Sequence, residues 1–155
     1  MKFDLETTAF IESGCALIVG TVGVGNEPCA SRGWGLTVLD EPGRIRLLLD
    51  AVDTATATNV DGGGALAITG ASIRTLQSVQ LKGRAVSIEP ASPDDEARAG
   101  RYCDAMFDAI HETDFTPMAL LEQLRPVSYL ACVVVVTDVF NQTPGPGAGE
   151  RLVDR

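Results

Sequence analysis

Six segments of the chain have the hydrophobic pattern of β-strands, with apolar residues either alternating with polar ones or running without interruption. Most of them are rich in β-branched residues and end at glycine, proline or acidic residues, which is typical of strands separated by turns. Short turns at 23–27 and 40–43 join the first three segments, which predicts an antiparallel meander. The six predicted strands are 15–22, 29–39, 44–49, 65–69, 76–89 and 127–140.

The fifth predicted strand changes its inward-facing side along its length. Val79 and Gly83 share one face, but Val86 and Ile88 have the opposite parity. Such a change requires an additional residue, so the pattern predicts a β-bulge at 83–84, where the strand can bend round the corner of a barrel. The sixth predicted strand is different, because its middle part is apolar on both faces and is therefore expected to be buried on both sides.

Helical patterns lie between these strands. A capping Ser92, a proline at the first helical position and an apolar stripe predict one long amphipathic helix at 93–112. Thr7 or Thr8 can cap a first short helix and Asp53 a second one. The predicted short helices lie at 6–13, at 53–60 and between Pro117 and Pro126.

The order of these elements predicts the fold class. A parallel nucleotide-binding sheet would need helices between most of its strands, and this chain does not have them. We therefore expect one domain over residues 1–155, mainly β, built as a six-stranded antiparallel barrel with peripheral helices. Residues 141–155 are rich in proline and glycine and are expected to form an irregular C-terminal arm.

Composition and charge exclude several classes of protein. The 155 residues carry 12 Lys and Arg against 21 Asp and Glu, a net charge of -9, which opposes general binding to nucleic acid or to an anionic membrane. No apolar run has the length that spans a bilayer, and residues 1–8 lack the pattern of a signal peptide. The sequence thus predicts a cytoplasmic protein. Its four cysteines are dispersed, so we expect buried free thiols.

The motifs of common hydrolases and nucleotide-binding enzymes are missing from the sequence. It contains neither a phosphate-binding G-x-x-x-x-G-K-[ST] loop nor a G-x-S-x-G nucleophile elbow. His111 is the only histidine, which excludes a metal site with several histidines. We expect His111 to interact with the free carbonyl groups at the end of the long helix. No metal site is predicted.

Positive charge is concentrated in one part of the chain. The segment 32–84 holds six of the twelve cations against five acidic residues, a net of +1, whereas the remainder carries -10. This distribution indicates either a small anion bound by charge-assisted hydrogen bonds or cations at exposed strand positions.

Two predicted strands also carry unusual residues. Trp34, the only tryptophan, stands between two glycines, a pattern that suits a flat ligand close to the backbone and equally a tryptophan that fills the core. Ser78, Gln80 and Lys82 alternate with apolar residues and share one face of the fifth strand. That face is either exposed to solvent or part of a site covered by a partner.

In the order of these segments the sequence resembles the pyridoxamine 5'-phosphate oxidase-like family, the FMN-binding split β-barrels. The similarity covers residues 6–149. The strand that contains Gln77-Ser78-Val79-Gln80-Leu81-Lys82-Gly83-Arg84 is its most specific part. The other similar segments are 15–22, Ser31-Arg32-x-Trp34, 53–60 and Val139-Phe140-Asn141-Gln142-Thr143-Pro144-Gly145-Pro146-Gly147.

The resemblance implies a homodimer with two FMN sites at the subunit interface. Residues of the second strand would contact the flavin, residues after the third strand would bind its phosphate, and the fifth strand would line the same pocket. Carried over by position, the implied FMN-binding residues are Arg32 and Trp34; Thr54, Thr56 and Asn59; and Ser78, Gln80 and Lys82. In the C-terminal segment, Pro144 and Pro146 fix an extended path, which suits an arm that lies across the partner beside the cofactor; the alternative is a frayed terminus.

Two departures from the family's pattern narrow the function. Thr54-Ala55-Thr56 replaces the basic pair that holds the phosphate in the oxidases, and the tryptophan- and arginine-containing C-terminal signature for vitamin B6 substrates is absent. The resemblance thus implies an FMN-dependent oxidoreductase whose small-molecule substrate is not pyridoxamine phosphate. The alternatives are a dimeric module that binds a flavin, a deazaflavin or haem without turnover, and a barrel without a ligand that serves as a dimeric partner protein.

Overall fold

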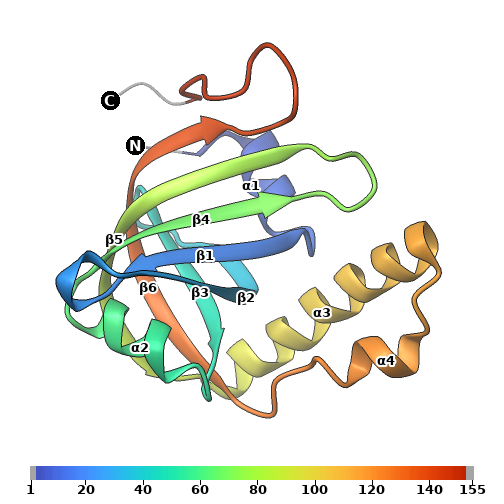
Figure 1. The fold of residues 1–155 in the computed structure, drawn as a ribbon, viewed down its shortest axis with the longest axis horizontal. Helices are drawn as coiled ribbons and strands as arrows, with labels where there is room; N and C mark the ends of the chain where they lie inside the picture. Colours follow the sequence, from blue (N-terminus) through green and yellow to red (C-terminus); the bar gives the residue numbers. More distant parts are fainter. Residues whose placement is uncertain (1–2, 153–155) are drawn as a thin grey trace.

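The computed structural model describes residues 3–152, and the six predicted strands form a closed antiparallel barrel in them (Figure 1). The order round the barrel is β1-β2-β3-β6-β5-β4. The prediction of a six-stranded antiparallel barrel with peripheral helices is therefore confirmed. The strands are β1 (Ala16–Val22), β2 (Pro28–Val38), β3 (Arg44–Asp50), β4 (Ala65–Ala71), β5 (Ser78–Pro90) and β6 (Tyr129–Asn141).

The pairing of β5 with β6 contains two bulges, at positions that differ from the predicted one. Thr137 is the additional residue on β6, because Lys82 pairs with Asp138 and the next residue, Gly83, pairs with Val136. A Cβ atom on Gly83 would lie 2.2 Å from the carbonyl oxygen of Val135, so only glycine fits there.

The second bulge is on β5 itself. Ala85 pairs with Val134 and Ser87 with Val133, which leaves Val86 unpaired and 54% exposed. The predicted change of parity therefore occurs at Val86 and not at 83–84, since the residues before it keep the original inward alternation.

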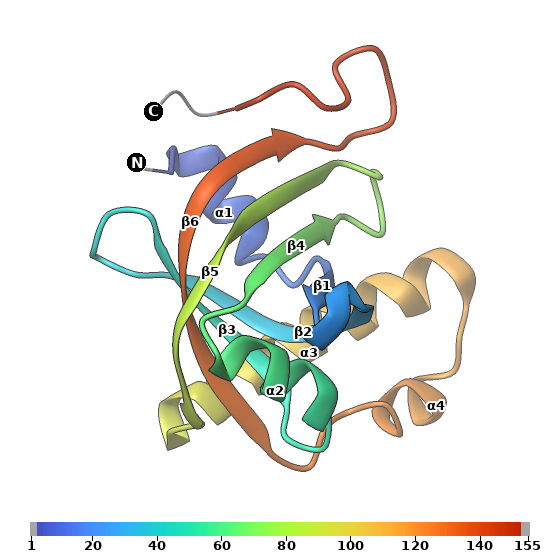
Figure 2. The same cartoon turned by 60° about the vertical axis from the view of Figure 1, so that its left-hand side comes forward.

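The helices lie outside the barrel (Figure 2). The first is capped by Asp4, whose carboxylate accepts a hydrogen bond from the backbone N–H of Thr7 at 2.6 Å, so the prediction of a threonine cap is wrong. Asp53 and Ser92 are the caps predicted for the second and third helices. The helices are α1 (Leu5–Ile11), α2 (Thr54–Asp61), α3 (Pro93–Asp114) and α4 (Met118–Glu122). None of the described helices is long and apolar enough to cross a membrane.

Apolar side chains form two clusters. The larger fills the barrel, with Val19, Ile45, Leu81 and Val134 all at most 2% exposed. The smaller lies between the outer surface of the barrel and α3, and contains Trp34, Leu48, Cys103, Met106, Phe107 and Ala131. Of the four free cysteines, three are buried as predicted and Cys29 is half-buried. The helix α3 therefore converts part of the outer barrel surface into a second core.

The segment after β6 returns to its own barrel. The N–H of Asn141 donates to the carbonyl of Glu150 at 2.8 Å, and that of Leu152 donates to Val139 at 2.8 Å. Because Arg44, the first residue of β3, pairs with Val135, the end of β6 has no partner from β3, and the returning segment takes its place. Residues 142–152 thus differ from the extended path predicted for the arm; residues 153–155 lie outside the described part of the chain.

Candidate functional site

A groove of about 810 Å³ lies on the outer surface of the barrel, over the neighbouring strands β4, β1 and β2 and the adjoining parts of β5 and β6. Its floor consists mainly of small residues that point outward from the strands, among them Gly20, Ala30, Ala65 and Ala67. Outward positions with larger side chains would fill this space. The hollow therefore results from the choice of small residues at alternate positions of adjacent strands.

One wall of the groove is positively charged. Lys82 and Arg84, two residues apart on β5, line it from the same face. The Lys82 ammonium lies 4.9 Å from the centre of the Phe140 ring, a cation–π contact. Arg84 donates a hydrogen bond to the carbonyl of Gly63 at 3.3 Å. Among residues 3–152 no carboxylate lines the groove itself. The nearby carboxylate of Asp138 lies 2.8 Å from the hydroxyl of Thr137, a lining residue, and is paired with Arg151.

Of the implied residues on β5, Lys82 is brought to the groove. Gln80 is on the same outer surface, where its amide donates to the hydroxyl of Thr69 on β4 at 3.1 Å. Ser78 is at the other end of the strand, buried, with its hydroxyl donating to the carbonyl of Leu76 at 3.0 Å and its N–H to Thr143. Ser78, Gln80 and Lys82 therefore lie along β5 as the alternation predicts. Ser78 contacts the C-terminal segment at one end, and Lys82 lines the groove at the other.

The two implied residues on β2 lie in different environments. Arg32 is exposed on the outer surface and pairs in register with Ile18 of β1. Trp34 is 6% exposed and packs under α3, so it is a core residue and does not line the groove. Its glycine neighbours have packing roles: a Cβ on Gly33 would lie 2.9 Å from the Cβ of Leu17. This position agrees with the core-filling alternative for Trp34.

The implied phosphate-binding residues on α2 mostly face the barrel. Thr56 is fully buried, with its hydroxyl 3.8 Å from the sulfur of Cys29. Asn59 donates to the hydroxyl of Thr21 at 2.9 Å, which fixes the helix to β1. Of these three side chains Thr54 is exposed, Asn59 is half-buried and Thr56 is buried.

The start of α2 is also electrostatically unsuited to a phosphate. The carboxylate of Asp53 accepts a hydrogen bond from the N–H of Thr56 at 3.1 Å and so occupies the helix N-terminus. Burial alone would raise the pKa of Asp53, but the hydrogen bonds that it accepts, from the Thr56 N–H first, lower that pKa overall. An ionised carboxylate in this place repels an incoming anion.

Most of the residues that form the groove carry no signal in the sequence, because they are small and chemically inert. Ala65 and Ala67, separated by one buried leucine, carry the only indication: small residues at consecutive outward positions of a strand. Arg84 was predicted only as part of the cation-rich segment and as an alternative to Lys82 at the phosphate. A hollow depends on which strands are neighbours, and the alternation along one strand does not contain that information.

Comparisons with known proteins agree with this architecture. No family model and no curated protein matches the sequence. Solved structures do match: HupZ from Group A Streptococcus superposes with a TM-score of 0.57 at 16% identity, covering 95% of this chain and 100% of that one. A structure described as an F420 reductase has a TM-score of 0.55 at 13% identity and covers 84% of this chain and 93% of that one.

A third solved structure, a candidate pyridoxamine 5'-phosphate oxidase from Lactobacillus delbrueckii, matches with a TM-score of 0.52 at 18% identity. The match covers 90% of this chain and 93% of that one. At these identities the comparison concerns the fold alone. Together with the closed barrel of six antiparallel strands, it shows that the chain has the split-barrel fold of the pyridoxamine 5'-phosphate oxidase-like proteins.

Proposed function

We propose that the protein binds FMN or a related flat flavin-type cofactor in the groove over β1, β4 and β5 and acts as an oxidoreductase on a small molecule. The observation that carries the proposal is a groove of about 810 Å³ with a floor of glycine and alanine and a wall that bears Lys82 and Arg84. This volume lies within the range of small-molecule and cofactor sites, roughly 300–1,000 Å³.

The groove suits the ring and the anionic chain of such a cofactor in different ways. Gly20, Ala65 and Ala67 allow a flat ring to approach the backbone of the strands. The phosphate does not fit at the start of α2, where Asp53 caps the helix. We assign it to the side of β5 instead, where Lys82 and Arg84 can donate charge-assisted hydrogen bonds.

A second copy of the chain completes the site in this proposal. The groove is open to solvent along the barrel, and Ile18 and Val22 on β1 are each 47% exposed. A flat ring bound there would keep one face in water unless a partner surface covered it. Substitution of Ile18 by aspartate should therefore reduce both the mass in solution and the cofactor affinity.

The chemistry of the lining favours a redox reaction. A bound flavin supplies hydride or electron transfer, and the protein supplies position and electrostatics. Within residues 3–152 the groove has no histidine or carboxylate for acid–base work. Because the sequence lacks the C-terminal signature for vitamin B6 substrates, the proposed substrate is a small molecule other than pyridoxamine phosphate.

The second candidate is a module that binds such a cofactor without turnover, and the same groove supports it. A deazaflavin is one possible ligand, since a solved structure of this fold is described as an F420 reductase. Haem fits less well. His111 does not line the groove, and its Nδ1 lies 2.9 Å from the carbonyl oxygen of Thr116 at the end of α3. Among the described residues, Cys29 is the one sulfur donor in the lining.

Cofactor titration and reduction distinguish these functions. The purified protein is titrated with FMN, riboflavin and a deazaflavin, followed by visible absorbance and flavin fluorescence, and the loaded protein is then mixed with a nicotinamide reductant under anaerobic conditions. Binding with reduction supports the oxidoreductase, and binding without it supports the module. Absence of binding to all three contradicts the proposal.

A matched pair of variants locates the site. Ala67→Leu places a larger side chain on the floor of the groove and should weaken the cofactor by about tenfold or more. Ala97→Leu makes the same change at an exposed position of α3 and should leave the affinity unchanged. Equal affinities of the two variants would place the cofactor elsewhere.

A further inference from the structure

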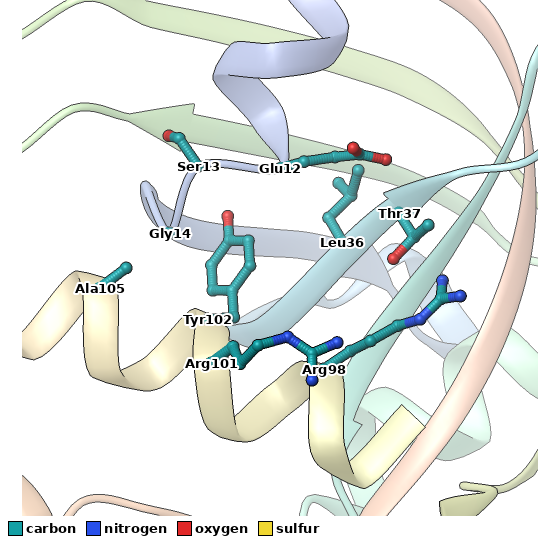
Figure 3. A pocket seen from close by; sticks show the side chains of 9 residues that line it. All are labelled: Glu12, Ser13, Gly14, Leu36, Thr37, Arg98, Arg101, Tyr102 and Ala105. Atoms are coloured by element: carbon teal, nitrogen blue, oxygen red, sulfur yellow. The ribbon is translucent and has the colours of Figure 1, made fainter. Parts of the chain in front are cut away.

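A second hollow, of about 370 Å³, lies between the end of α1, strand β2 and helix α3 (Figure 3). It shares no lining residue with the groove and contains none of the implied cofactor residues. Its polar lining includes Glu12, Thr37, Arg98 and Arg101, and its apolar lining includes Leu36 and Tyr102. This volume is at the small end of the range for small-molecule sites.

Two arginines dominate one side of this pocket. Arg98 and Arg101 are three residues apart on α3, and Figure 3 shows both side chains running from the helix toward the space beside Leu36 and Thr37. In the described part of the chain neither has a carboxylate within 4.0 Å or a side-chain hydrogen bond, although the protein is strongly acidic. Two like charges on one helix face repel each other, and a bound anion would remove that repulsion.

The walls of the pocket are held together before any ligand arrives. The Tyr102 hydroxyl lies 3.1 Å from the carbonyl oxygen of Ile11 and 3.0 Å from that of Cys15, which ties α3 to the turn between α1 and β1. At that turn Gly14 has a φ of 87°, and a Cβ on it would lie 2.6 Å from the Cβ of Ala105. The close approach therefore requires glycine, and it fixes the distance between the walls.

The opposite edge of the pocket carries a negative charge. The carboxylate of Glu12 accepts a hydrogen bond from the backbone N–H of Val38 at 2.6 Å, which holds it against β2. Figure 3 shows this carboxylate above Leu36 and the two guanidinium groups below. The pocket is thus polarised, with donors for an anion on one side and an acceptor on the other.

We propose that this pocket binds a small organic molecule with one carboxylate or phosphate group and, at its other end, an ammonium or hydroxyl group. Arg98 and Arg101 hold the anionic group, with the hydroxyl of Thr37 as an additional donor. Glu12 accepts a hydrogen bond from the other end and repels ligands that carry a second anion there. This site is separate from the groove and does not depend on the proposed cofactor.

Nuclear magnetic resonance of the arginine side chains tests the proposal. The Nε–H signals of Arg98 and Arg101, assigned by single lysine substitutions, are followed during titration with 4-aminobutyrate, O-phosphoethanolamine and succinate. We expect saturable shifts of both signals with one or both of the first two probes, which also shows whether a carboxylate or a phosphate is preferred. Succinate should bind more weakly because its second carboxylate faces Glu12.

Three variants give the controls. Arg101→Ala should weaken the preferred probe by about tenfold or more, whereas Arg44→Ala, which removes an exposed cation from β3, should not. Glu12→Gln keeps an acceptor for the N–H of Val38 and should reverse the preference, so that succinate binds more tightly. Absence of saturable shifts with all probes, equal weakening by Arg44→Ala, or no response to Glu12→Gln overturns the proposal; unchanged amide spectra show that each variant is folded.

Discussion

The outer surface of the barrel is covered on one side and open on the other. Over β2, β3 and β6, helix α3 buries Trp34 and Leu48, which are 6% and 3% exposed. Over β1, the apolar Ile18 and Val22 are each 47% exposed. Both sides arise from the same alternation along the strands. Apolar outward residues therefore do not tell whether the chain covers a face itself or leaves it for a ligand or a second copy.

Charged groups show the same difference. On the covered side Arg46 donates two hydrogen bonds to Asp95, at 2.8 and 2.7 Å, which joins β3 to the start of α3. On the open side Lys82 and Arg84 have no carboxylate within 4.0 Å in the described residues. The arginine of β3 on the covered side is thus paired with a carboxylate, whereas the two cations of β5 on the open side are not. This contrast is the main structural reason for placing the ligand on the open side.

The largest expected effect is on the covered side. Phe107 is fully buried between α3 and the barrel, so Phe107→Ala should lower the free energy of unfolding by about 3–5 kcal/mol. Val86→Ala, at the exposed bulge of β5, should change it by less than about 0.5 kcal/mol. Urea unfolding measures both. Similar losses for the two variants would contradict the division of the surface into a covered and an open side.

The next effect concerns the ion pair that closes the covered side. Asp95→Asn removes a charge that is nearly buried and leaves the Arg46 guanidinium without its main partner, so we expect a loss of about 2–3 kcal/mol. Glu89 also contacts Arg46 but its side chain is 57% exposed, and Glu89→Gln should cost less than about 1 kcal/mol. Equal losses of stability for Asp95→Asn and Glu89→Gln would contradict this prediction, because burial of the Arg46–Asp95 pair would then not increase its contribution to stability.

The same pair predicts a pH dependence. Hydrogen bonds from Arg46, followed by those from Ser92, hold the pKa of Asp95 well below its ordinary value of 3.8. The unfolded chain therefore takes up this proton at a higher pH than the folded one, so the contribution of Asp95 to stability is present above about pH 4 and is lost as the pH falls below it. The stability of Asp95→Asn should vary less over that acidic range, as measured by urea unfolding at several pH values.

The fold could be predicted where the determining residues are close in sequence. Asp53 and Ser92 cap their helices as local geometry requires, and the strands follow from alternation. The change in the inward-facing side of β5 indicates that the strand contains one additional residue. Which residue this is depends on the pairing with β6, and that pairing leaves out Val86. The return of the C-terminal segment depends on where β3 ends beside β6, which is a long-range property.

The candidate site was harder to predict for the same reason. Lys82 could be predicted as a residue of the candidate site for two reasons. The resemblance implies a cofactor contact at this position, and the alternation along β5 places its side chain on the outer face. Trp34 has equally suggestive neighbours but lies under α3, because the covering of a strand face depends on tertiary packing. Thr56 has the same chemistry as Thr54, but only helical phase decides that it faces the barrel. Residue type was thus a poorer guide than position relative to the covered side.

A smaller effect tests the open side directly. If Lys82 is near the phosphate, Lys82→Ala should weaken FMN by about 1.5–3 kcal/mol and riboflavin much less, since the two differ by the phosphate. Arg44→Ala, which removes an exposed cation outside the groove, is the control for net charge. Fluorescence titration measures the affinities. Equal losses for FMN and riboflavin would remove Lys82 from the phosphate site and leave Arg84 or Arg32 for that role.

The smallest effect concerns the C-terminal segment, which lies at the edge between the two sides. Arg151 pairs with Asp138 of its own barrel, and both side chains are about one-third exposed, at 34% and 29%. Solvent weakens such a pair, so Arg151→Ala should lower the free energy of unfolding by less than about 1 kcal/mol, and still less in high salt.

Flavin affinity distinguishes the two paths of this segment. Because Arg151 contacts its own β6 and does not line the groove, Arg151→Ala should leave the affinity for FMN unchanged. An arm that crossed to a partner would lose its anchor in the same variant, and the affinity would fall while the stability of the chain stayed constant. The two measurements on one variant therefore separate a segment that protects the end of β6 from one that forms a wall of the neighbouring site.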